Sequence, residues 1–118
     1  WSPDGKFVVV GNGSVVGRNF DIYYFNSVTN TYSVCTFGPS GSGSVAVNWS
    51  SDGKYIVVTD FSPPVINLYS FIPNNQNANF FGSSVQLLAQ TTVTSTRRAD
   101  LSPDGQWYSW GPDLSVTE

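Results

Sequence analysis

The stretch WSPDGKFVVV, residues 1–10, decides the fold because it occurs again as WSSDGKYIVV at residues 49–58. A weaker third copy, LSPDGQWYSW, occupies residues 101–110. The aspartates of the three copies, Asp4, Asp52 and Asp104, are separated by 48 and 52 residues. Self-similarity at a fixed period is the signature of a repeat architecture. The chain is therefore expected to consist of equivalent structural units of about 50 residues.

Each copy joins turn chemistry to an apolar run. Proline presets the backbone for the first central position of a type I turn, and aspartate tolerates the position after it. The glycine accepts the positive φ that returns the chain to a sheet. An aromatic and apolar run follows at once, so each copy is predicted to connect two antiparallel strands. We expect the three aspartates to serve these turns rather than to form a carboxylate site.

Short apolar segments separated by Gly-, Asn- and Ser-rich breaks continue the pattern between the copies. No segment has convincing helical periodicity. Strands are predicted at residues 6–10, 20–25 and 31–37 of the first unit, 44–49, 54–59, 65–71 and 85–92 of the second, and 96–101 of the third. Four short strands in about 50 residues make up one blade of a β-propeller. The sequence thus predicts an all-β fold made of four-stranded antiparallel blades.

The blade boundaries follow from the repeat. Blade one is expected at residues 1–43 without its inner strand, blade two at 44–95, and the start of blade three at 96–118. About two and a half blades would leave apolar faces uncovered, and such faces are association surfaces. We therefore expect the chain to be part of a larger ring, completed by further blades of the same polypeptide or by copies of itself. The chain starts on Trp1 and contains no Met, which fits a piece of a larger or processed protein.

Composition removes several classes of function. The formal net charge is -3 with only five Lys and Arg residues, whereas nucleic-acid binding needs clustered basic side chains. There is no His, and Cys35 is the only Cys, so a His-based triad, a His-metal site and an internal disulfide are excluded within this chain. No cofactor and no membrane span are expected, because no apolar run approaches the roughly 20 residues of a membrane helix. The small number of charged residues is a feature common on extracellular or cell-surface proteins, and it weakly favours such a location.

The repeated string resembles the inner hairpin of WD-repeat-like propellers. The segments DIYYF at 21–25 and VINLYSF at 65–71 resemble the third strand of such blades. The Trp-Asp pair common in that strand and the Gly-His pair of the family are missing, so the chain resembles a divergent member. Lactonase-type propellers have strings similar to DGKYIVVTD at 52–60, and the propellers of prolyl-oligopeptidase-type hydrolases carry the same turn. These resemblances imply a propeller architecture without implying one activity.

The expected connectivity gathers the breaks at 11–18, 38–43, 61–64 and 93–98 on one face. Loops held by rigid sheets are common binding sites, and Arg and aromatic side chains are favoured anchors. The candidate binding residues are Arg18, Phe61, Arg97 and Arg98; no catalytic or metal-binding residue is predicted. The leading hypothesis is a non-enzymatic scaffold that binds a protein or peptide. The alternatives are a lactonase-like or hydrolase-associated propeller with catalytic residues outside this chain, and a self-assembling structural fragment.

Overall fold

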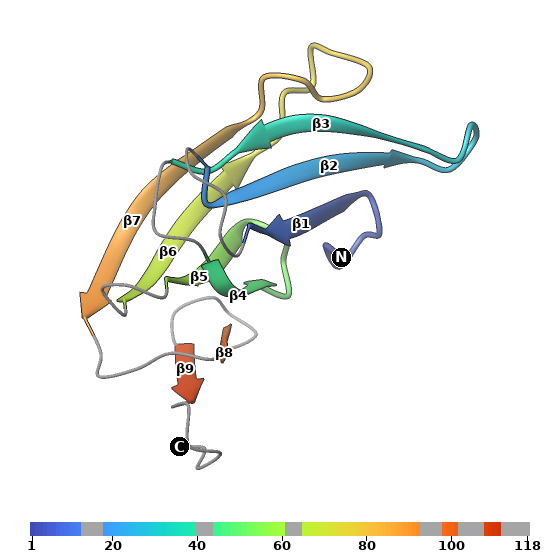
Figure 1. Ribbon diagram of the computed structural model, residues 1–118. Coiled ribbons are helices and arrows are strands. Elements are labelled where there is room, and N and C mark those ends of the chain that lie inside the picture. The colour runs from blue at the N-terminus through green and yellow to red at the C-terminus, as the bar shows by residue number, and fades with distance from the viewer. Residues whose placement is uncertain (13–17, 40–43, 61–64, 93–97, 102–107, 112–118) are drawn as a thin grey trace.

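The computed structural model describes residues 1–12, 18–39, 44–60, 65–92, 98–101 and 108–111, which form strands and turns with no helix (Figure 1). All strand pairs are antiparallel. The first sheet has the order β1 (Phe7–Gly11), β2 (Phe20–Asn26) and β3 (Thr31–Phe37). The second sheet has the order β4 (Ser44–Trp49), β5 (Tyr55–Asp60), β6 (Val65–Ile72) and β7 (Ser84–Thr92). The third sheet pairs β8 (Arg98–Leu101) with β9 (Tyr108–Gly111).

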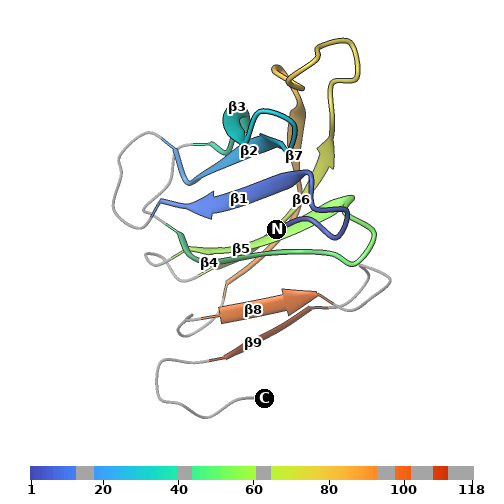
Figure 2. The same ribbon diagram turned by 90° about the vertical axis from the view of Figure 1, so that its right-hand side faces the viewer.

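The three sheets are stacked in the order of the chain (Figure 2). The first sheet contacts the second through β1 and β4, and the second contacts the third through β4 and β8. Strands β1 to β8 lie where the short apolar segments predict them, apart from small shifts at their ends, whereas β9 was not among the predicted strands. The prediction of an all-β fold of antiparallel sheets is therefore confirmed for the part of the chain described.

The two described turns of the repeat have the same hydrogen bonds. In the first, Ser2 Oγ donates to Asp4 Oδ1 at 2.6 Å and accepts from the amide of Phe7 at 3.0 Å. In the second, Ser50 Oγ donates to Asp52 Oδ1 at 2.6 Å and accepts from the amide of Tyr55 at 3.0 Å. The glycine in each turn has a positive φ, 73° in one and 74° in the other. Serine and aspartate thus close a tight hairpin that needs no partner from elsewhere in the fold.

The apolar core lies between the first and second sheets. Phe7 packs edge-on against Phe71 with ring centroids 5.0 Å apart, and Phe20 packs against Tyr69 at 5.1 Å. Such edge-to-face pairs add about 0.5–1.5 kcal/mol to the free energy of burial. The other buried members of this core are Ile22, Cys35, Trp49, Ile56 and Val58.

The long connection between β6 and β7 reaches back over the first sheet. The amides of Gly82 and Ser83 donate to the carbonyl of Cys35 at 2.9 and 3.2 Å. The ring of Phe80 lies 4.9 Å from that of Tyr24. This connection therefore fixes the outer strand β3 against the second sheet.

Replacing Ser50 by Ala should destabilise the fold by about 1–3 kcal/mol, because it leaves the half-buried amide of Tyr55 without its acceptor. Urea unfolding measures this cost, and Ser84→Ala at an exposed position should change stability by less than about 0.5 kcal/mol.

The pKa of Asp52 is lowered from 3.8 by the Ser50 hydroxyl and the Lys54 amide. Because the pKa of Asp52 is lower in the folded state than in the unfolded state, its ionised carboxylate stabilises the fold above pH 3.8. This stabilisation is lost as the pH falls further. The difference in the free energy of unfolding between Ser50→Ala and the wild type should thus become smaller in acid. A difference that does not change with pH would contradict the role of the carboxylate.

Gly38 lies against the buried ring of Phe20, and a Cβ at this position would stand 2.7 Å from Phe20 Cζ and closer to two other ring atoms. Gly38→Ala should therefore destabilise the fold by about 1–3 kcal/mol through overpacking. Thermal or urea unfolding of Gly38→Ala, Phe20→Leu and the double variant tests the cause. The double variant should lose less stability than the two single losses added together, because leucine relieves the clash. Additive losses would show that Gly38 is required for another reason.

Candidate functional site

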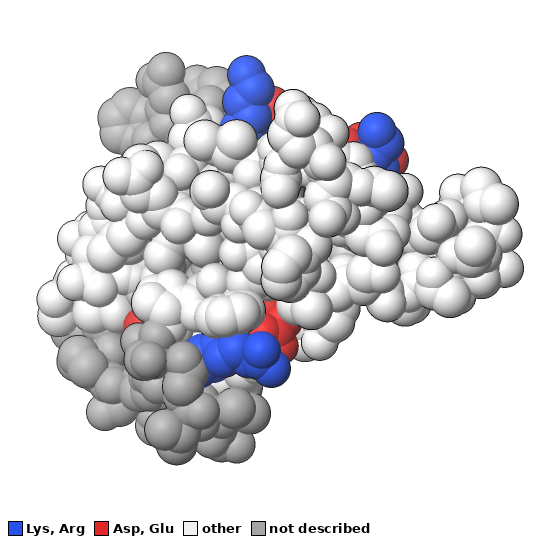
Figure 3. All heavy atoms as spheres, turned by 90° about the horizontal axis from the view of Figure 1, so that it is seen from above, with Lys and Arg blue, Asp and Glu red and all other residues white. Residues whose placement is uncertain are grey.

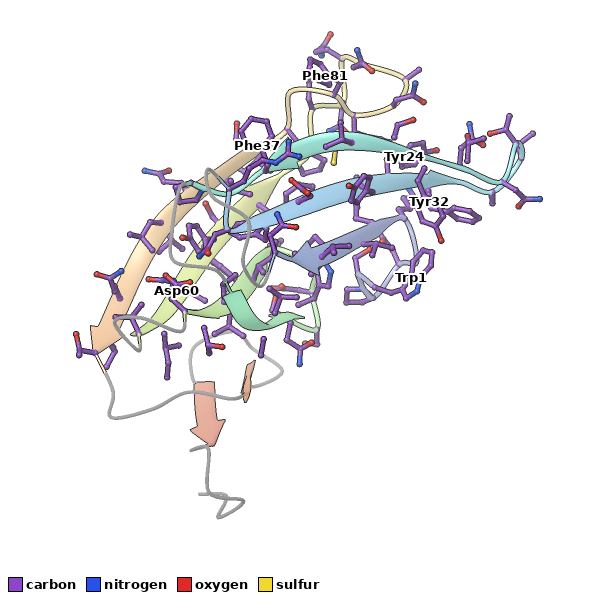
Figure 4. All side chains as sticks on the ribbon, in the orientation of Figure 1. Trp1, Tyr24, Tyr32, Phe37, Asp60 and Phe81 are labelled. Atoms are coloured by element: carbon purple, nitrogen blue, oxygen red, sulfur yellow. The ribbon has the colours of Figure 1, made fainter. Side chains whose placement is uncertain are left out.

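One end of the stacked sheets collects polar side chains that are buried or half-buried. At this end β1 and β5 finish and β2 and β6 begin, as the pairs Gly11↔Phe20 and Asp60↔Val65 show. We call it the loop face. Figure 4 shows Asp60 at this end, far from Trp1 and Tyr32 at the opposite end of the first sheet.

A network of three amides and one carboxylate crosses the junction of the two sheets at the loop face; we call it the polar cluster. Asn19, from the first sheet, donates through Nδ2 to Asp60 Oδ1. Asn67 Nδ2 donates to Asp60 Oδ2 at 3.1 Å, and Gln90 Nε2 donates to Asn67 Oδ1 at 2.7 Å. Asn19 and Asn67 are each 1% exposed, whereas Asp60 is half-buried. The carboxylate is therefore held by both oxygens in one orientation near the surface.

The negative charge of Asp60 also acts on Tyr69, a buried residue of β6. Burial, and then the negative charge of Asp60, raise the pKa of Tyr69 to about 12. Tyr69 therefore stays protonated over the whole physiological range.

Arg18 lies beside the polar cluster and is held on two sides. Its Nε is 3.2 Å from Asp21 Oδ1, and its guanidinium lies 5.2 Å from the centre of the Phe37 ring. The side chain is still 46% exposed, while that of Asp21 is 7% exposed. Asn12 Nδ2 donates to the other oxygen of Asp21 at 3.3 Å. Arg18 thus presents an oriented cation at the surface.

The face seen from above in Figure 3 carries few charges, and its basic groups lie next to acidic ones. Of the predicted binding residues, only Arg18 is fully described, and it lies on the loop face. Phe61 and Arg97 lie outside the described residues. Arg98 begins β8, and its backbone pairs with Gly111, but its side chain is outside the described part. These four positions stay predictions as binding residues.

Sequence reasoning missed the polar cluster. Asn67 was a signal, since it is a single amide inside the apolar run VINLYSF. Asp60 was a second signal, because it ends an apolar strand directly before a loop. Neither signal could show that Asn19, 41 residues before Asp60, completes the network.

The opposite end of the same junction holds a cavity of about 330 Å³ between the two Asp-Gly turns, lined by Asp4, Asp52, Lys54, Phe7 and Phe71 among others. Asp4 and Asp52 thus border the same cavity. Each carboxylate already accepts from a serine hydroxyl and a backbone amide. We therefore assign these groups to the turns.

Within the described ranges, no group of three or more His, Cys, Asp or Glu side chains is placed to hold a metal ion. In the same part of the chain, no helix is long and apolar enough to cross a membrane.

Comparison with known proteins gives the class of fold. No protein-family model matches the sequence, and no curated protein matches it. Among solved structures the chain is similar to a propeller-like lactonase fold. That structure is a "putative 6-phosphogluconolactonase" from Bacteroides uniformis, with a TM-score of 0.73 and 16% sequence identity. The match covers 95% of this chain and 31% of the neighbour. It fits the resemblance to lactonase-type propellers and gives no specific support to the WD-repeat family.

The prediction of a non-enzymatic protein is contradicted by this comparison, because the neighbour carries the name of an enzyme. The prediction rested on the lack of a catalytic constellation in 118 residues. That lack carries no weight in a chain that spans 31% of its neighbour, since the groups of one site can come from several repeats. The partner expected for a scaffold, a protein or peptide, has no support in the comparison.

Cys35 is part of the packed core and not a reactive thiol. Its side chain is 1% exposed, and Sγ donates to the carbonyl of Ile22 at 3.2 Å. Burial raises the pKa of the thiol to about 11. At pH 8 the folded protein should therefore react with a thiol reagent only as fast as it opens, and at once in denaturant. Rapid labelling of the native protein would contradict this assignment.

Proposed function

We propose that the chain is part of a propeller-type enzyme that hydrolyses a lactone, and that the loop face forms part of its site. The observation that carries the proposal is the similarity to the lactonase over 95% of the chain. The chain corresponds to 31% of that neighbour's length. We further propose that the remaining blades complete the ring and supply the rest of the catalytic groups.

Hydrolysis of a lactone needs a group that accepts a proton from water. The water oxygen forms a bond to the carbonyl carbon, the ring C–O bond breaks, and the proton taken from water is returned to the leaving alkoxide. Asp60 suits the role of general base because Asn19 and Asn67 fix the orientation of its carboxylate. Both of these contacts come from neutral amides.

Recognition of an acidic lactone needs a cation near this carboxylate. Arg18 directly precedes Asn19 in the chain, and its guanidinium is half-exposed on the same face. Arginine binds phosphate and carboxylate oxygens through two parallel hydrogen bonds. We assign Arg18 to the anionic group of the substrate, with Arg97 and Arg98 as further candidates. A sugar lactone that carries a phosphate, the class named for the neighbour, satisfies this requirement.

The polypeptide that contains this chain should hydrolyse 6-phosphogluconolactone. Asp60→Asn should lower kcat by about 10²–10⁴-fold, the usual contribution of a general base. Asp52→Asn, at the opposite end of the sheets, is the matched control and should retain the wild-type kcat. Arg18→Ala should raise KM for the phosphorylated lactone more than for glucono-lactone.

Thermal unfolding of Asp60→Asn keeps this test interpretable, because the variant loses an acceptor of the polar cluster. A folded variant with wild-type kcat would remove Asp60 from the mechanism. A folded wild-type polypeptide that does not hydrolyse either lactone would overturn the proposed function.

A further inference from the structure

We propose that the outer edge of the first sheet binds a neutral polysaccharide, a function separate from the proposed hydrolysis of a lactone. The site is an open groove of about 130 Å³, which we call the rim groove. Phe37 is 53% exposed and Phe81 is 63% exposed. Figure 4 shows both rings on the side of the molecule that carries β3 and the β6–β7 connection. The rim groove is lined by Val34, Cys35, Thr36, Phe37, Phe81 and Gly82.

Packing of sheets against one another does not cover this part of a sheet. By the strand registers, Val34 and Phe37 of β3 are the counterparts of Leu87 and Gln90 of β7. The second sheet packs against the first through the face that carries Tyr69. Leu87 pairs with Tyr69 on that face and is still 47% exposed, and Gln90 is exposed as well. A further blade packed on the first sheet should therefore leave the rim groove open.

The rim groove lies in a surface that is almost without charge. Residues 22–51 and 61–96, which include β3, β7 and the β6–β7 connection, contain no Asp, Glu, Lys or Arg. In a typical soluble domain about 25% of the residues are charged. Figure 3 looks onto this side of the molecule, and most of it is uncharged. Arg18 lies over the ring of Phe37, but it is paired with Asp21 and adds no net charge.

This chemistry favours a neutral sugar as the ligand. The connection carries exposed amides at Asn75, Gln76 and Asn79 beside the two aromatic rings. The C–H face of a sugar ring packs on an aromatic ring, and its hydroxyls exchange hydrogen bonds with side-chain amides. Phosphate groups and anionic lipids need clustered cations, which residues 22–51 and 61–96 do not contain. The volume of the groove is close to the roughly 150 Å³ of a cavity that holds benzene, so a single six-membered ring matches its size.

The residue before Phe81 has a strained backbone that directs the Phe81 ring outward. Phe80 has a φ of 57°, a left-handed conformation that is rare for a bulky side chain. Its own ring packs into the core, 4.9 Å from the ring of Tyr24 and 5.2 Å from that of Phe7. Residues held in such conformations cluster at binding sites. An exposed aromatic ring obtained at this cost therefore supports a role in binding.

The connection holds Phe81 in place before any ligand binds. Asn74 Nδ2 donates to the carbonyl of Phe81 at 2.8 Å, and Ser83 Oγ donates to the carbonyl of Phe80 at 2.6 Å. The amides of Gly82 and Ser83 tie the connection to β3 through the carbonyl of Cys35. Binding to a preformed groove costs little further ordering of the protein.

Affinity electrophoresis of the full polypeptide that contains this chain tests the proposal, in gels that contain dextran, soluble starch, galactomannan or xyloglucan. At least one of these neutral polysaccharides should slow the wild-type protein. Phe81→Ala should raise its dissociation constant about tenfold, because the stacking and burial of the ring are lost. Phe81→Leu should weaken binding in the same way, since leucine has no ring, whereas Phe81→Trp should retain it. Val28→Ala, at a valine 91% exposed between β2 and β3, is the control and should bind like the wild type.

Phe81 is exposed, so its variants should keep the urea midpoint of the wild type. A wild type that none of the four polysaccharides slows would overturn the proposal, as would a folded Phe81→Ala with unchanged binding. Full binding by Phe81→Leu would overturn it in favour of a general apolar contact. A concentration-dependent dimer in sedimentation that Phe81→Ala abolishes would overturn it in favour of a second copy of the chain. Phe81→Ala should keep the wild-type kcat for the lactone, so failure of either function is seen separately.

Discussion

The packing of aromatic rings between the first and second sheets is the interaction on which the rest of the structure depends. A single antiparallel sheet has two faces and cannot bury both of them by itself. Phe7, Phe20, Tyr69 and Phe71 fill the space between two such sheets and fix their separation and angle. Two polar features of the described residues, the Asp-Gly turns and the polar cluster, lie at opposite ends of this packed layer. Their geometry is therefore set by the apolar contact between them.

Those two ends use polar groups in different ways. At the turn end, each aspartate bonds to a serine two residues before it and to an amide two residues after it, so the network is local. At the loop face, Asn19 and Asp60 come from different sheets and meet only when the sheets pack. Burying an amide without a partner costs free energy of order 1–3 kcal/mol. The polar cluster thus depends on correct docking of the two sheets, as a site assembled between repeats would.

The sequence predicts features that depend on neighbouring residues and misses those that depend on distant ones. Strands β1 to β8 and the two described Asp-Gly turns follow from apolar segments and turn chemistry within about ten residues, and the structure has them at the expected places. Asn67 is polar in an apolar strand, but its purpose is visible only when Asp60 and Gln90 are placed beside it. The expectation of a non-enzymatic scaffold failed for a related reason. Counting catalytic residues within one short chain cannot represent a site that several repeats build together.

Asp60 and Asn67 of the second sheet occupy the positions that Asn12 and Asp21 have in the first sheet, so the acid and the amide have exchanged places. If the pair at Asp60 and Asn67 served packing alone, either arrangement would satisfy the junction equally, and the two sheets use both. The charge differs at the ends of the equivalent strands β5 and β1: β5 ends with the carboxylate of Asp60, and β1 is followed by the neutral amide of Asn12. Each pair keeps one carboxylate, but the carboxylate of Asp60 is half-buried whereas that of Asp21 is 5% exposed. The two sheets are therefore equivalent in their packing and differ in the position at which each presents its negative charge at the loop face.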